Sequence, residues 1–135
     1  MTKKHTTVMI RPYEEKDFQL INVLNQAEGW NNLVDKQEDT KQAWNNSAIA
    51  FVAEANGEIV GCFRGLTDGF ITLYVCELLI HKDCRGQGIG RRLLAHAHEL
   101  YPKTRLELLA SSTSHTYYES EGFRPFYGFR KTILE

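Results

Sequence analysis

A glycine-rich turn between a strand-like stretch and a helix-like stretch carries the strongest chemical signal in this sequence. Three glycines alternate in Arg85–Gly90, and the residues that follow place Ile89, Leu93 and Ala97 on one face of a helix. The first backbone amides of a helix have no internal partner, and the helix dipole adds partial positive charge there. Glycines let the main chain approach a ligand closely. The turn therefore predicts a phosphate-binding site.

Two nucleotide-binding motifs share this kind of turn, and the surrounding sequence disfavours both. A dinucleotide fingerprint opens a βαβαβ series, whereas this turn lies about two-thirds of the way along the chain, after an antiparallel hairpin. A Walker loop has Lys-Ser or Lys-Thr after its last glycine, and Arg91 and Arg92 stand there instead. Nucleotide binding by an unrelated fold stays among the hypotheses.

Length and composition limit the class of protein. The chain has 135 residues, of which 42% are hydrophobic and 24% charged, so we expect one domain over residues 1–135 with residues 1–7 as a disordered tail. No apolar run approaches the roughly 20 residues of a membrane span, and no signal-peptide core follows the N-terminal lysines. The three cysteines form no CxxC pair, and the histidines and cysteines do not cluster at metal-ligand spacing. We expect a cytoplasmic protein with reduced thiols, no metal and no membrane partner.

Charge is unevenly distributed, although the net charge is only −1. Residues 81–105 hold six Lys and Arg against two Asp and Glu, whereas residues 14–54 hold eight acids against three bases. The overall balance gives no reason to expect nucleic acid as a partner. The basic segment coincides with the glycine turn. The acidic segment suits a cationic substrate, although a solvated helix surface explains it equally well.

The elements that position the turn follow from hydrophobic periodicity. We expect helices over residues 14–28 and 35–45, a break over 29–32, and a short helix around Tyr117–Glu119 that ends at Gly122. We expect strands over residues 8–11, 48–54, 58–65, 70–81 and 105–110, with one or two more over 123–134. Asn56–Gly57 is a strong hairpin signal. The strand after the central helix should lie parallel to the strand before it, through a right-handed crossover.

Three motifs together resemble one enzyme family. Residues 77–90, Glu-Leu-Leu-Ile-His-Lys-Asp-Cys-Arg-Gly-Gln-Gly-Ile-Gly, resemble the acyl-CoA-binding motif of the GNAT N-acetyltransferase superfamily, Arg/Gln-x-x-Gly-x-Gly/Ala after a strand. Residues 117–123, Tyr-Tyr-Glu-Ser-Glu-Gly-Phe, are similar to its second motif, Phe/Leu-Tyr-x-x-x-Gly-Phe. Residues 9–12, followed by Asp17 and Phe18, resemble its usual start. The motifs occur in the family's order over about residues 9–130.

The resemblance implies a fold and a co-substrate. The fold class is α/β (α+β), with a mixed, mostly antiparallel sheet of six to seven strands flanked by about four helices. Acetyl-CoA would place its pyrophosphate on the amides of the glycine turn and pair its pantetheine arm with the main chain of the motif strand. Many relatives have Asn where this chain has Ser111, which can still form one hydrogen bond. The cofactor-binding residues implied are Leu78, Leu79, Ile80, Arg85, Gly86, Gln87, Gly88, Ile89, Gly90, Arg91, Ser111 and Tyr118.

The resemblance also implies a reaction, in which acetyl passes from acetyl-CoA to a primary amine by direct attack in a ternary complex. Tyr118 matches the family tyrosine that protonates the leaving thiolate. A phenol with a pKa of about 10 can donate a proton to a thiolate whose basicity is comparable to that of the phenolate. Glu77 is the candidate general base, because many relatives carry an acid at this point of the motif strand. The alternative is a strand Glu that pairs with an arginine or binds substrate. His81 and His115 are weaker candidates.

The acceptor is the least determined part of the sequence interpretation. The resemblance places its pocket between the first two helices and the last strands, where Trp30 and Trp44 would face Phe126 and Tyr127. The acids of this region are Glu28, Asp35, Glu38 and Asp39. An acidic and aromatic rim suits a small cationic amine, or a lysine or N-terminal amine of a protein. The alternative is that both tryptophans are ordinary packing residues.

Two broader questions stay open from the sequence. A non-catalytic acyl-CoA-binding or regulatory module would keep the glycine turn without turnover, and it predicts acetyl-CoA binding with no acetyl transfer. The sequence leaves the oligomeric state undetermined, with a homodimer among the options.

Overall fold

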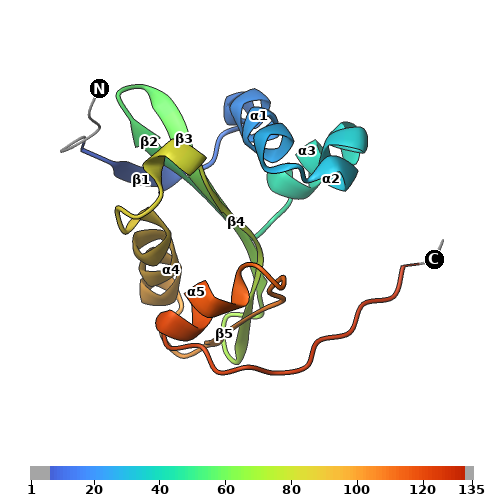
Figure 1. Cartoon of the computed structure of the whole chain (residues 1–135), viewed down its shortest axis with the longest axis vertical. Helices are drawn as coiled ribbons and strands as arrows, with labels where there is room; N and C mark the ends of the chain where they lie inside the picture. The colour runs from blue at the N-terminus through green and yellow to red at the C-terminus, as the bar shows by residue number, and fades with distance from the viewer. Residues whose placement is uncertain (1–6, 133–135) are drawn as a thin grey trace.

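A single five-stranded sheet runs through the computed structural model, which describes residues 7–132 (Figure 1). Its strands, in spatial order, are β1 (Met9–Pro12), β2 (Ile49–Ala55), β3 (Glu58–Thr67), β4 (Thr72–Ile80) and β5 (Arg105–Leu108). The pairs from β1 to β4 are antiparallel, and β5 pairs with β4 in parallel. The predicted mixed, mostly antiparallel sheet is therefore confirmed.

Helices cover both faces of this sheet. They are α1 (Phe18–Glu28), α2 (Asn31–Asp35), α3 (Gln37–Asn45), α4 (Ile89–Leu100) and α5 (His115–Ser120), with short 3-10 helices η1 (Glu15–Asp17) and η2 (Lys82–Cys84). Figure 1 shows α1, α2 and α3 on one side of the sheet and α4 and α5 on the other. The N-terminal tail expected over residues 1–7 lies outside the described residues, apart from residue 7.

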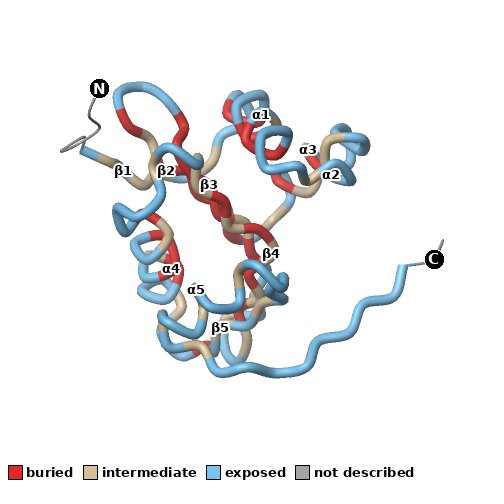
Figure 2. The backbone as a smooth tube through the Cα atoms, viewed as in Figure 1, coloured by how far each residue is buried: buried red, intermediate tan, exposed pale blue. Residues whose placement is uncertain are grey.

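Each face of the sheet has its own apolar core. On one face α4 buries Ile89, Leu93 and Ala97, which recur at helical spacing, and on the other α1 buries Ile21 and Leu24. The strands between them are buried along most of their length, as the red segments of Figure 2 show. The sheet is therefore buried between helices that pack on both of its faces.

The predicted elements are largely confirmed. The hairpin between β2 and β3 turns at Asn56 and Gly57, whose φ angles of 55° and 79° are those that this turn requires. β5 follows α4 and lies parallel to β4, as expected for a crossover. The break expected over residues 29–32 is shorter than predicted, because left-handed Gly29 ends α1 and α2 already begins at Asn31.

The one or two strands predicted over residues 123–134 are the main difference between the sequence prediction and the structure. Among the described residues the sheet has five strands instead of six to seven, because residues 123–132 form no strand. They run past the end of β5 and then away from the body of the molecule (Figure 1). Pro125 has no N–H to donate to a ladder, and Gly128 has no side chain to pack on a sheet. Residues 133–134 of the predicted strand lie outside the described part of the chain.

A β-bulge at Cys76 decides which face each β4 side chain reaches. Arg64 pairs with Glu77, whereas the next β3 residue, Gly65, pairs with Val75, so Cys76 is an extra residue in β4. An extra residue reverses the alternation of side chains beyond it. Val75 accordingly belongs to the core under α4, and Leu79 to the core under α1.

Candidate active site

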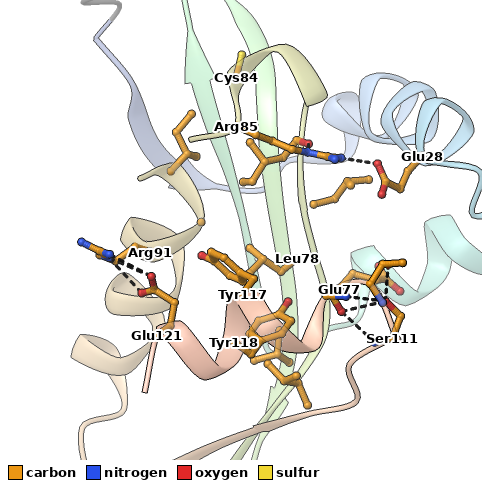
Figure 3. Close-up of a pocket in the computed structure, with 18 of the residues that line it drawn as sticks. Glu28, Glu77, Leu78, Cys84, Arg85, Arg91, Ser111, Tyr117, Tyr118 and Glu121 are labelled. Carbon is orange, nitrogen blue, oxygen red and sulfur yellow. Dashed lines mark hydrogen bonds and ion pairs between the residues drawn. The ribbon is translucent and has the colours of Figure 1, made fainter. Parts of the chain in front are cut away.

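A gap between β4 and β5 opens into a pocket lined by β4, the glycine turn and α5. The two strands pair only from Thr72 opposite Arg105 to Val75 opposite Leu108, whereas β4 continues to Ile80. The rest of this edge of β4 borders a pocket of about 900 Å³ (Figure 3). Main-chain groups of β4 can therefore pair with an extended ligand instead of a strand. The sequence resemblance implied that a pantetheine arm pairs with the main chain of this strand, and the gap leaves that main chain open.

The glycine turn lies at one end of the pocket. Gly86 and Gly88 both have φ of 81°, a left-handed conformation that other residues rarely adopt, and Gly88 is the N-cap of α4. A Cβ at either position would meet no atom within 4 Å, so the turn presents bare main chain. At Gly90 a Cβ would lie 2.6 Å from the Tyr117 hydroxyl oxygen. The start of α4 thus has the open amides that a phosphate group requires.

Two arginines flank this end of the pocket, and each is paired with a carboxylate. Arg91 Nε and Nη2 donate to the two oxygens of Glu121, each at 3.1 Å, and this pairing raises the pKa of Arg91. Arg85 forms an ion pair with Glu28 and donates from Nε to the carbonyl of Ile80 at 3.0 Å. An anionic ligand at the turn would compete with these carboxylates for the guanidinium groups.

Arg92, the other arginine after the glycine turn, points elsewhere. Its Nη2 donates to the Val8 carbonyl at 3.0 Å, and it does not line the pocket. Of these two adjacent arginines, only Arg91 is therefore positioned to supply charge to a phosphate group at the turn.

Tyr118 of α5 lies at the middle of the pocket. Its ring packs edge-on against Tyr117, with centroids 5.1 Å apart, and against Phe123, with centroids 5.5 Å apart. Burial raises the pKa of Tyr118 to about 12, with a smaller contribution from Tyr117. The phenol therefore stays protonated throughout the neutral range and can act as a proton donor.

Glu77 reaches the pocket from the opposite face of the sheet. Its side chain is buried, and Arg64 Nε and Nη2 donate to its two oxygens at 3.1 and 2.8 Å. Arg64 also donates from Nη1 to the hydroxyl of Ser47, just after α3, at 3.2 Å. The pairing with an arginine that the sequence left open is thus present. Figure 3 shows Tyr118 between the Arg91–Glu121 pair and Glu77.

The structure brings together nearly all of the predicted site residues. Both proposed catalytic residues line the pocket, as do all the predicted cofactor-binding residues except Gln87, which is exposed on the turn. His81 and His115 do not line it.

The expected acceptor rim is only partly formed. Glu28 and Trp30 line the pocket, whereas Trp44 is 1% exposed and belongs to the core beneath α1. The other three acids of the expected rim are exposed away from the pocket lining. Phe126 and Tyr127 do not line it either. Of the residues expected to form the acceptor rim, only Glu28 and Trp30 therefore line the pocket.

Several residues in or beside the pocket were not singled out from the sequence. Arg64 does not line the pocket but holds Glu77, and finding it requires the β3–β4 register together with the bulge at Cys76, neither of which has a local sequence signal. Tyr117 was not among the predicted site residues, yet its hydroxyl lies over Gly90 and it lines the pocket. Glu121 stands within the second motif, and its charge three residues after Tyr118 was the available signal.

Residues 7–132 were searched for a metal site and for a membrane-spanning helix, and neither is present in this range. No three His, Cys, Asp or Glu side chains in this range gather closely enough to hold a metal ion. No helix in this range has the length and apolar character that crossing a membrane requires.

Comparison with known proteins identifies the domain type. A family model described as an acetyltransferase (GNAT) domain matches residues 46–125. A solved GNAT-family acetyltransferase from Streptococcus pneumoniae is 24% identical, with 96% of this chain and 100% of that chain covered and a TM-score of 0.78. Comparison with curated protein sequences yields no match.

Two aminoglycoside acetyltransferases share the fold. One, an aminoglycoside N-acetyltransferase in complex with CoA, is 11% identical, with 97% of this chain and 99% of that chain covered and a TM-score of 0.74. The other, from an uncultured soil metagenomic sample and in complex with sisomicin, is 17% identical, with 93% and 96% covered and a TM-score of 0.68. At these identities the likeness is one of fold.

Proposed function

The chain belongs to the GNAT acetyltransferase family, and from that premise we propose that it transfers an acetyl group from acetyl-CoA to a primary amine. The observation that carries the proposal is the gap between β4 and β5. One pocket in this gap is lined by the start of α4, by Tyr118 and by Glu77. Tyr118 reaches it from one face of the sheet and Glu77 from the other. A cofactor and an acceptor can therefore approach from opposite faces and meet in the gap.

The residues present fit acetyl-CoA as the co-substrate. The backbone amides from Gly88 to Gly90, at the positive end of α4, suit a pyrophosphate, and Arg91 adds a full positive charge. The unpaired edge of β4 from Leu78 to Ile80 suits the amide groups of a pantetheine arm.

The proposed chemistry moves two protons between the enzyme and the reactants. The acceptor ammonium first loses one proton to solvent, because a protonated nitrogen has no lone pair; the neutral amine nitrogen then attacks the carbonyl carbon of the thioester, and the bond between that carbon and sulfur breaks. Tyr118, protonated because burial raises its pKa to about 12, donates its phenolic proton to the departing sulfur. Glu77 accepts the proton that the amine nitrogen loses. A β4 amide close to Leu78 would polarise the carbonyl oxygen.

Direct attack is preferred to a route through an acetylated cysteine. Cys76 is the pocket cysteine nearest in sequence to Glu77, and burial raises the pKa of its thiol. A thiol that resists deprotonation is a poor nucleophile. The raised pKa of Cys76 therefore supports a ternary complex of enzyme, acetyl-CoA and amine.

The acceptor is proposed to be a cationic amine. Glu28 and Trp30 line the pocket, and a carboxylate beside an indole suits an ammonium group. Two proteins that share the fold are described as aminoglycoside acetyltransferases, so polycationic aminoglycosides belong in the tested panel beside simple amines and lysine peptides.

Calorimetry with acetyl-CoA and a thiol-release assay over this amine panel test the proposal. We expect saturable acetyl-CoA binding and release of thiol that depends on the added amine. Absence of saturable binding contradicts the proposal outright. Binding without turnover across the panel, unchanged by Tyr118→Phe and Glu77→Gln, favours a non-catalytic acyl-CoA-binding module. Competition by ATP or NAD but not by desulfo-CoA indicates a nucleotide site instead.

A further inference from the structure

The phenol of Tyr117 lies over the start of α4, inside the pocket. A Cβ on Gly90, the second residue of that helix, would lie 2.6 Å from the Tyr117 hydroxyl oxygen and 3.5 Å from its Cζ atom. Both residues line the pocket. In Figure 3 the Tyr117 hydroxyl points toward the Arg91–Glu121 ion pair. The hydroxyl therefore faces the end of the pocket where the glycine turn lies.

The Tyr117 hydroxyl is a hydrogen-bond donor that no group within residues 7–132 accepts from. The Tyr13 hydroxyl, by comparison, donates to Asn45 Oδ1 at 2.8 Å. Burial raises the pKa of Tyr117, and the negative charge of Glu121 raises it further, whereas Arg91 opposes both. The phenol is therefore protonated at neutral pH and is free to donate to a ligand.

Three kinds of donor converge on this end of the pocket. They are the first backbone amides of α4, the guanidinium of Arg91 and the phenol of Tyr117. A phosphate carries negative charge and several acceptor oxygens, so it can accept from all three. Arg91 is already paired with Glu121, so the amides and the phenol, which are neutral donors, matter more in this site.

The hydroxyl at position 117 is a departure from the family motif. Residues 117–123 resemble a motif whose first position is Phe or Leu, and this chain has Tyr there. Phe or Leu can pack at this position but cannot donate a hydrogen bond. Packing alone therefore does not require the hydroxyl.

We propose that Tyr117 donates a hydrogen bond to the pyrophosphate of acetyl-CoA bound at the start of α4. This inference rests on the proposed function and adds a binding residue to it. Tyr117 packs edge-on against Tyr118, with ring centroids 5.1 Å apart. A bond from Tyr117 to the pyrophosphate would therefore also hold the ring against which the proposed proton donor packs.

Calorimetry with CoA and with dephospho-CoA tests the assignment. Dephospho-CoA lacks the phosphate on the ribose but keeps the pyrophosphate. Tyr117→Phe removes the hydroxyl and keeps the ring, so we expect the dissociation constants of both ligands to rise about 10-fold. Tyr101→Phe, at the opposite end of α4, is the matched control and should leave both constants unchanged. Circular dichroism and thermal unfolding verify that each variant is folded.

Gly90→Ala tests the same contact from the side of α4. The added methyl group would lie 2.6 Å from the Tyr117 oxygen, so it must displace the hydroxyl. We expect CoA binding to weaken about 10-fold. Tyr117→Phe should cause no further loss in this variant, because both substitutions remove the same contact.

Four results overturn the inference when the native chain binds CoA saturably. These are unchanged binding of both ligands by Tyr117→Phe, a loss confined to CoA, an equal loss in Tyr101→Phe, and fully additive losses for Tyr117→Phe and Gly90→Ala. A loss confined to CoA would place the hydroxyl at the ribose phosphate instead. Absence of saturable binding by the native chain would contradict the proposed function itself.

Discussion

Arg64 of β3 and Glu77 of β4 are direct partners in the strand register, and two hydrogen bonds of 3.1 and 2.8 Å join the guanidinium to both carboxylate oxygens. The bulge at Cys76 creates this pairing because it turns Glu77 toward the α1 face. The proposed base is therefore held in one position by a partly buried arginine, which in turn donates a hydrogen bond to Ser47.

Substitutions of Glu77 and Arg64 distinguish a catalytic role of Glu77 from a structural one. We expect Glu77→Gln to lower kcat about 100-fold, with little change in the KM for acetyl-CoA. Arg64→Met leaves the buried carboxylate without its partner, which should reduce the free energy of unfolding by about 3 kcal/mol. Steady-state kinetics and urea unfolding measure the two effects.

The double variant Arg64→Met, Glu77→Met is the decisive control. Two apolar side chains of similar volume can replace a buried ion pair without loss of stability. We expect the free energy of unfolding to recover while turnover stays low. Recovery of both would assign Glu77 a structural role only.

Tyr118 should titrate at unusually high pH. Its pKa is raised to about 12 by burial, so the proton-donating form persists through the alkaline range, and its ionisation does not cause an alkaline loss of rate. The difference in tyrosinate absorbance between the native protein and Tyr118→Phe measures this directly. A difference titrating near the ordinary tyrosine value of about 10 would contradict the burial seen here.

The same substitution tests proton donation to sulfur. We expect Tyr118→Phe to lower kcat about 100-fold. Tyr117→Phe is the matched control, because it removes a neighbouring pocket hydroxyl and leaves Tyr118 in place, and its effect on kcat should be much smaller. Equal effects would indicate that neither hydroxyl is the specific donor.

Alanine substitutions at Gly88 and Gly69 are matched variants that test the proposed phosphate site. Both are left-handed, with φ of 81° and 83°, and in neither case would a Cβ meet an atom within 4 Å. Alanine at either position should reduce the free energy of unfolding by about 1 kcal/mol. Only Gly88→Ala should weaken acetyl-CoA binding in calorimetry, because Gly88 begins α4 at the pocket, whereas Gly69 lies in the β3–β4 turn.

Asp17 makes stability depend on acid pH. Two hydrogen bonds from Arg11, each of 2.9 Å, lower the pKa of the buried Asp17, and the Glu14 amide adds a third at 2.8 Å. A lowered pKa means that the stabilisation is complete above the ordinary aspartate value of about 3.9. It is lost as pH falls through the lower value of the folded state.

Asp17→Asn should therefore reduce the free energy of unfolding by about 2 kcal/mol at neutral pH and make its decline toward acid pH shallower. Urea unfolding at neutral and acid pH measures both changes. Asp39→Asn, at an exposed position of α3, should alter neither. An unchanged acid profile in Asp17→Asn would show that other carboxylates govern it.

The sequence by itself determined the features that depend on neighbouring residues. The alternating glycines of Arg85–Gly90 require a left-handed turn, Asn56–Gly57 requires a tight hairpin, and the helical spacing after Ile89 requires an amphipathic helix. Each follows from local backbone preference or from one apolar face, so each could be predicted. The glycine turn and the hairpin were within reach for that reason, whereas the mixed sheet was implied by the family resemblance.

Only the tertiary structure decided the features that join distant residues. The register that sets Arg64 against Glu77 depends on one extra residue in a ladder, and a shift of one position reverses every side chain beyond it. Trp44 is core because α3 packs on the sheet, although its sequence neighbours are polar. Residues 123–132 include strand-like residues, but whether such a segment joins a sheet depends on which sheet edge is available, and that is a property of the assembled fold.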